Sequence, residues 1–176
     1  MKSRLIITPV ENLQDQINSL VKSQKTKTGI YVSLNKTQKS IEQILKQENI
    51  ATNKLFFIDC VASIKEKEDV LHIPPNDLNE LIYAIKTFFK EISEEKYLII
   101  DALSTFLIYN ETNKVAEFIN KITSLCIENN VELIALSPVT KGEELLNKIF
   151  NFFDQVKKPT KDATQKKTKD GQELIY

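Results

Sequence analysis

The chain has 176 residues, 41% of them hydrophobic and 27% charged, which suffices for one globular domain without disulfides or a structural metal. No apolar run approaches the ~18 residues of a membrane-spanning helix, and no apolar leader follows the N-terminus, so we expect a cytoplasmic protein without a membrane contact. Cys60 and Cys126 lie in separate apolar runs, a spacing that predicts neither a disulfide framework nor a zinc site.

The net charge of zero is unevenly distributed. Residues 157–176 carry a balance of +3 and few apolar side chains, so this lysine-rich tail is predicted to be disordered. Residues 1–156 carry −3 and offer no broad basic surface. We therefore do not expect nucleic-acid binding, apart from contacts that the tail could make.

Strand and helix patterns alternate along the chain. Short runs rich in β-branched and aromatic residues predict strands over 5–8, 29–34, 55–61, 97–103 and 131–137. Helical periodicity follows or separates them over 13–21, 41–45, 78–92, 115–125 and 145–156. Asp77 with Glu80, and Thr140 with Glu143, predict capping boxes. The alternation predicts an α/β fold over residues 1–156, a doubly wound, mainly parallel sheet of five or slightly more strands with helices on both faces.

Ligands of doubly wound sheets bind outside the carboxyl ends of the strands. The polar residues at those ends are the candidate nucleotide- or ligand-binding residues: Thr8, Asn35, Asp59, Asp101, Ser104 and Ser137. Polar residues at strand ends are expected in any such fold, so this set alone does not identify a ligand.

Asp101 ends the apolar run that starts at Tyr97, the position of the acid that holds the water shell of Mg²⁺ in P-loop ATPases. The alternative is a structural carboxylate that bonds backbone amides or the Ser104 hydroxyl. The sequence contains no G-x-x-x-x-G-K-[ST] motif, and its only glycines are Gly29, Gly142 and Gly171. Without that motif the structural interpretation is favoured.

The order of these pieces resembles the RecA/KaiC-like ATPase superfamily, found in many archaeal signalling proteins, over roughly residues 4–156. Three runs carry the resemblance: 29–34 looks like the second strand of the family, 54–60 like the third, and 97–109 like the Walker B strand with the segment after it. The resemblance implies a RecA-like fold and domains that assemble edge to edge around a nucleotide.

Two segments depart from the family. The first strand continues into Pro9–Gln16, which has no glycine or lysine to bind phosphates, and Glu11 and Asp15 would repel them by roughly 1 kcal/mol each. After the second strand, where the family usually has an acidic pair, stands Asn35-Lys36-Thr37, and neither an amide nor an ammonium group can accept a proton from water. We therefore expect no catalysis, no metal and no cofactor, although weak binding of Mg-ATP stays open.

The sequence thus favours a non-catalytic RecA/KaiC-like domain that regulates or scaffolds through a protein partner, either a second copy or an active relative. The alternative is a nucleotide- or small-ligand-binding protein or enzyme that uses the same crevice without a P-loop. A phospho-acceptor role for Asp59 is disfavoured, because Thr8-Pro9 stands where a receiver domain needs an acidic pair. His72 is expected on a surface loop, and Phe152 falls off the last helical stripe, where an exposed aromatic would indicate a docking surface.

Overall fold

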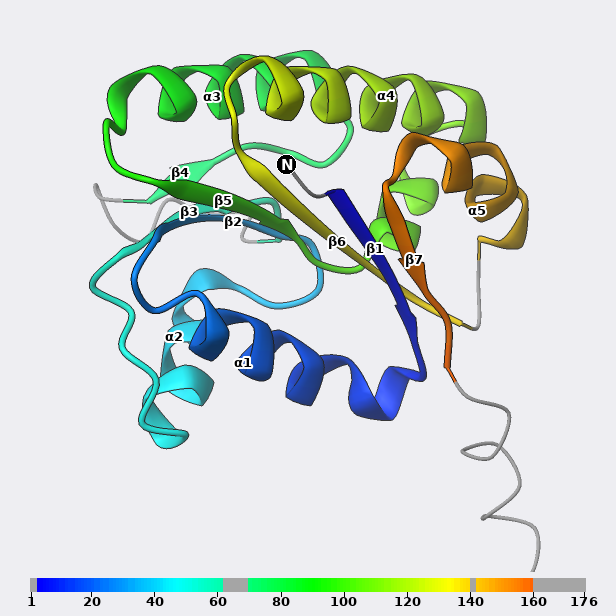
Figure 1. Ribbon diagram of the computed structural model, residues 1–176. Helices are drawn as coiled ribbons and strands as arrows, with labels where there is room; N and C mark the ends of the chain where they lie inside the picture. Colours follow the sequence, from blue (N-terminus) through cyan, green and yellow to red (C-terminus); the bar gives the residue numbers. More distant parts are fainter. Residues whose placement is uncertain (1–2, 62–69, 140–141, 160–176) are drawn as a thin grey trace, which may run out of the picture.

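The computed structural model describes residues 3–61, 70–139 and 142–159. Its centre is one sheet of parallel strands in the order β4-β3-β2-β5-β6-β1-β7 (Figure 1). The strands are β1 Ser3–Thr8, β2 Thr28–Ser33, β3 Leu55–Asp59, β4 Leu71–His72, β5 Lys96–Ile100, β6 Glu132–Pro138 and β7 Gln155–Lys157. The predicted α/β class is confirmed, with two short strands beyond the five expected.

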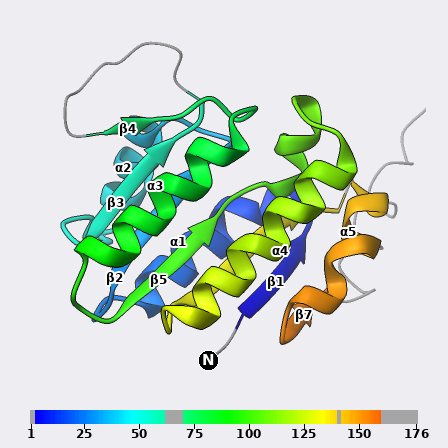
Figure 2. The same ribbon diagram turned by 90° about the horizontal axis from the view of Figure 1, so that it is seen from above.

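Helices cover both faces of the sheet. On one face lie α1 Leu13–Ser23 and α2 Gln38–Gln47, and on the other lie α3 Leu78–Glu91, α4 Thr112–Glu128 and α5 Glu143–Ile149 (Figure 1). Figure 2 shows α3, α4 and α5 side by side above the strands. Short 3-10 turns occupy Val10–Asn12, Leu103–Ile108 and Phe150–Phe152. Within the described residues, no helix combines the length and the apolar character needed to cross a membrane.

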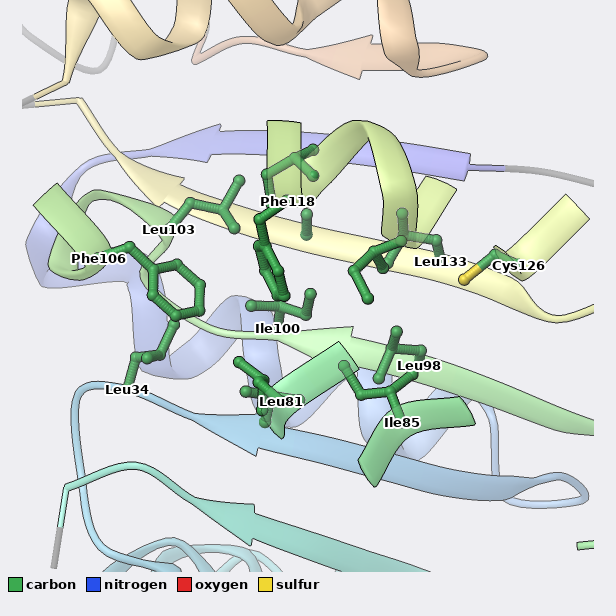
Figure 3. Close-up of a cluster of buried hydrophobic side chains, with 14 of the residues drawn as sticks. Leu34, Leu81, Ile85, Leu98, Ile100, Leu103, Phe106, Phe118, Cys126 and Leu133 are labelled. Atoms are coloured by element: carbon green, nitrogen blue, oxygen red, sulfur yellow. The ribbon is translucent and has the colours of Figure 1, made fainter. Parts of the chain in front are cut away.

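The central strands are apolar on both sides because each side is covered. In β5, Leu98 and Ile100 face α3 and α4, whereas Tyr97 and Ile99 face α1 and α2, as alternation along a strand requires. The larger cluster, under α3 and α4, includes an edge-to-face aromatic pair, Phe106 and Phe118, with ring centroids 5.2 Å apart (Figure 3). Burial of these side chains supplies the main stabilisation of the fold.

The chain end differs from the predicted helix over 145–156. Helix α5 stops at Ile149, a 3-10 turn follows, and Val156 lies in β7, which pairs with β1. Phe152 is partly buried against the larger core cluster, so it does not provide the exposed aromatic that would have indicated a docking surface. The apolar period continues past the helix because Phe150, Phe152 and Phe153 pack onto the same core, whereas Val156 in β7 is exposed.

Three local expectations have different outcomes. The cap at α3 is confirmed, because Asp77 Oδ1 accepts a hydrogen bond from the Glu80 amide at 3.0 Å. Thr140 lies outside the described residues, and α5 begins at Glu143 behind Gly142, whose φ of 94° suits glycine. His72 was expected in a surface loop but lies in β4, with ring nitrogens that are buried and have no hydrogen-bond partner among the described residues.

The sheet also extends to Lys157, the first residue of the predicted tail, and residues 160–176 lie outside the described part of the chain.

Gly29 of β2 lies in close contact with side chains of both neighbouring strands, β3 and β5. A Cβ built there would lie 2.4 Å from Leu55 Cδ2 and 2.6 Å from Tyr97 Cζ, far inside contact distance. The Tyr97 ring therefore lies directly against the β2 backbone, at the amino end of the sheet. A larger residue than glycine at position 29 would displace this ring.

Candidate functional site

The parallel strands bring the candidate residues to one edge of the sheet, formed by the carboxyl ends of the strands. The chain turns toward opposite faces after neighbouring strands at two places, between β2 and β5 and between β1 and β6. Such switch points are where doubly wound folds bind ligands. We describe the polar groups at each in turn.

Asp101 lies at the first switch point and is fully buried, with 2% of its surface exposed. Its Oδ2 accepts a hydrogen bond from the Tyr31 hydroxyl at 2.9 Å, and its Oδ1 accepts one from the Leu34 amide at 2.6 Å. The backbone of Asp101 in turn donates to the Val32 carbonyl at 3.2 Å. This carboxylate therefore bonds the end of β2, as the structural interpretation predicts, although through Tyr31 rather than Ser104.

Asp59 bonds the same connection from the other side. Its Oδ2 accepts a hydrogen bond from the Gln38 amide, the first residue of α2, at 2.8 Å. Its Oδ1 accepts one from the Val61 amide at 2.8 Å. The segment from Leu34 to Gln38, here called the β2–α2 connection, is thus bonded at its start by Asp101 and at its end by Asp59.

Within this connection, Asn35 is exposed and Thr37 caps α2 by accepting from the Ser40 amide at 3.3 Å. Asn35, Lys36 and Thr37 line a shallow, wide groove of about 550 Å³ along α2. The Asn35 backbone also donates to Asp101. Asn35 and Asp101 are therefore neighbours, but one faces solvent and the other the interior.

The second switch point is closed by backbone pairing. Thr8 lies opposite Pro138, and the Thr8 carbonyl accepts a hydrogen bond from the Val139 amide at 3.0 Å. A single residue, Pro9, separates β1 from the 3-10 turn that leads into α1, and Glu11 in that turn is exposed. Thr8 lines a small hollow of about 230 Å³, separate from the groove that Asn35 lines.

The two serines have different surroundings in the fold. Ser137 is 1% exposed, and its hydroxyl has no hydrogen-bond partner in the described residues. Alternation along β6 places it on the face of Leu133 and Ala135, opposite to the face of Tyr31 and Asp101. Ser104 packs near Gly142, with its Cβ 3.6 Å from where a Cβ of that glycine would be. The six predicted residues thus share an edge but not one cavity.

Burial gives Asp101 unusual acid–base behaviour. Removal from water raises its pKa from 3.8 to about 6, although the Leu34 amide, the Tyr31 hydroxyl and the charge of Lys36 work in the opposite direction. Burial, followed by the charge of Asp101, raises the pKa of Tyr31 well above its ordinary value. No three His, Cys, Asp or Glu side chains of the described ranges gather as a metal site would need.

Tyr31 is the partner that the sequence did not reveal. It lies inside the apolar run of β2 and reads there as a core aromatic. The available signal was its hydroxyl, because a buried tyrosine usually needs a hydrogen-bond partner.

Comparison with known proteins supports the fold and leaves the activity open. The model of a family of unknown function, DUF7090, matches residues 2–168. No curated protein matches the sequence.

Two solved structures from the archaeon Pyrococcus horikoshii share the fold at low sequence identity. The KaiC-like protein PH0186 is 12% identical with a TM-score of 0.57 over 78% of this chain, which spans 61% of that protein. The uncharacterized protein PH0321, solved in complex with an unknown peptide, is 13% identical with a TM-score of 0.70 over 89% of this chain and 76% of that protein. The RecA/KaiC-like fold inferred from the sequence is therefore confirmed.

Replacing Asp101 should separate its geometric role from its charge. Asp101→Ala leaves the Leu34 amide and the Tyr31 hydroxyl buried without a partner, and should lower the free energy of unfolding by about 2–4 kcal/mol. Asp101→Asn keeps an acceptor for Leu34 and should cost much less at neutral pH. Urea unfolding at pH 7.5 measures both, and equal losses in the two variants would contradict this assignment.

The raised pKa of Asp101 also predicts a pH dependence of stability. The folded state holds this proton more tightly than the unfolded chain, so the contribution is complete below pH 3.8 and disappears as the pH rises through about 6. Between pH 7.5 and 5.0, the wild type should gain about 1 kcal/mol relative to Asp101→Asn. Subtracting the variant removes the titration of other groups, and parallel pH profiles would show that Asp101 does not titrate in this range.

Proposed function

The chain belongs to DUF7090, the family of unknown function whose model matches it, and we propose that it acts as a non-catalytic RecA/KaiC-like domain. In this proposal it regulates or scaffolds through contacts with other proteins and has lost ATP hydrolysis. The observation that carries the proposal is the internal bonding of both strand-end carboxylates, Asp59 and Asp101. An acid that holds the water shell of Mg²⁺ must present an oxygen to that shell.

The connection after β1 supports the same conclusion. A phosphate-binding loop needs several glycine-rich residues whose amides surround the phosphate oxygens. Here Pro9 alone separates the strand from the turn, and proline has no amide hydrogen to donate. Glu11 is exposed in the turn and would add a repulsive charge.

Bonding of Asp101 makes recruitment of a metal unfavourable. To approach Mg²⁺, its carboxylate would have to release the Leu34 amide or the Tyr31 hydroxyl inside the core. Each released group would then lack a partner and cost about 1–3 kcal/mol. The β2–α2 connection would lose its anchor at the same time.

A protein partner is supported by a neighbour and by one edge of the sheet. PH0321 was solved with a bound peptide, so this fold can hold a peptide segment in that protein. Among the described residues of the present chain, β4 pairs with only Ile58 and Asp59 of β3. Leu71 of β4 and Phe56 of the neighbouring β3 are 40% and 46% exposed, and Phe56 packs on Phe88 with ring centroids 5.8 Å apart. A short edge strand beside exposed apolar side chains is a surface that another chain can cover.

We expect no heat of binding when the protein is titrated calorimetrically with Mg-ATP to millimolar concentration, and no phosphate release above the buffer blank. The physical reason is that the described residues contain no glycine-rich phosphate-binding loop, and that the Asp101 carboxylate already bonds groups of the protein. Asp101→Asn is the matched variant. Binding by the wild type that this variant abolishes would establish a working nucleotide site and refute the proposal.

The partner surface has its own test. Phe56→Ser should abolish self-association in sedimentation velocity, or the capture of a specific protein from extracts of cells that produce the chain. Ile127→Ser, equally apolar and 61% exposed on α4, is the matched control and should change neither. Thermal unfolding of both variants checks the fold. Retention of every wild-type partner by Phe56→Ser would rule this edge out.

A further inference from the structure

A second concave region lies at the opposite end of the sheet from the candidate site. It is a hollow of about 380 Å³. The elements around it, which Figure 1 shows as ribbons, are the end of α1, the segment after α2 and the starts of β2, β3 and β5. We call it the amino-end hollow. It is lined by Val21, Lys22, Gln24, Lys25, Lys27, Asn49, Ile50, Ala51, Asn53, Lys54, Leu55 and Tyr97. Its volume is that of a small-molecule site.

The charged side chains of this lining are all lysines. Lys27 pairs with Glu95 and Glu132, each at 3.1 Å, and Lys54 Nζ contacts the Thr26 carbonyl at 3.4 Å. Lys22 and Lys25 form no ion pair with the described residues. The positive charge of the lining therefore comes from Lys22, Lys25 and Lys54, because Lys27 is compensated by its two carboxylate partners.

Tyr97 provides an independent observation at the bottom of the hollow. The residue is 1% exposed, its ring lies against Gly29, and its hydroxyl donates to none of the described residues. Tyr31, the other fully buried tyrosine of this face, bonds Asp101. Because Tyr97 lines the hollow, its hydroxyl offers a donor there that is available to a ligand.

We propose that the amino-end hollow binds a small organic anion, a phosphate or carboxylate attached to an apolar body about the size of one ring. The ammonium groups of Lys22, Lys25 and Lys54 would attract the anionic group, and the Tyr97 hydroxyl would donate to one of its oxygens. The apolar body would lie on Val21, Ile50 and Leu55.

Lys22 has another explanation, because it lies in the last turn of α1, where a positive charge interacts favourably with the helix dipole. That interaction does not explain Lys54, which precedes β3, or the hydroxyl of Tyr97. The proposal concerns the end of the sheet away from Asp59 and Asp101, so it stands or falls independently of the proposed function.

Titration of the ¹⁵N-labelled full chain with phenyl phosphate and with benzoate, followed by amide chemical shifts, tests the inference. We expect saturable shifts in residues 22–27 and 53–55 with at least one of the two probes, and the probe that binds identifies the anionic group. Benzyl alcohol, the neutral counterpart, should produce none. Lack of saturable shifts with both anions at 10-fold excess over about 1 mM protein would overturn the proposal.

Variants separate binding from folding. Tyr97→Phe removes a hydroxyl that bonds none of the described residues, so it should leave the melting temperature unchanged and weaken binding of the probe by about fivefold. Lys25→Gln with Lys54→Gln should weaken it by about tenfold and reduce the salt dependence. Lys86→Gln with Lys90→Gln, exposed on α3, is the control for charge. Equal affinity in all variants, or inorganic phosphate binding as tightly as phenyl phosphate, would contradict the proposed geometry.

Discussion

The burial of the sheet on both faces is the constraint on which the rest of the structure depends. Each central strand must be apolar on both sides, so polar side chains can enter only where the strand ends. Asp59 and Asp101 stand at those ends and are still buried, so their oxygens need donors from the protein itself. Two of these donors, the amides of Leu34 and Gln38, belong to the β2–α2 connection, which is thereby fixed in position. Groups that could have bound a ligand instead organise the fold.

The same burial explains which elements the sequence could predict. The five central strands are continuous apolar runs because both faces are covered, and such runs are visible without any alignment. Strands β4 and β7 have two and three residues, lie at the edges and carry no such pattern. The helix predicted to Val156 was too long because a turn and an edge strand continue the apolar spacing of α5.

The candidate site was predicted less completely than the fold. The strand-end rule identified Asp59 and Asp101, but their partners are mostly backbone amides, such as those of Leu34 and Gln38, on which the side-chain type gives no information. Tyr31 lies within an apolar run, where the sequence alone indicates a core residue and not a hydrogen-bond donor to Asp101. The amino-end hollow could not be predicted from the sequence, because its residues come from segments 21–27, 49–55 and 97, and only the tertiary structure brings these together.

The position of β1 has a consequence for how the protein is made. Among the strands of the described residues β1 comes first, yet its two neighbours, β6 and β7, come last, with Ser3 opposite Leu133 and Leu5 opposite Val156. Asp154 completes the arrangement by accepting from the Ser3 amide at 2.8 Å. On the ribosome, β1 therefore precedes both partners and stays unpaired until β6, residues 132–138, has been synthesised, and its second edge stays open until β7 follows. The nascent chain exposes an apolar strand with two open edges throughout the first of these intervals, which makes chaperone protection during translation more important than the small size of the domain would indicate.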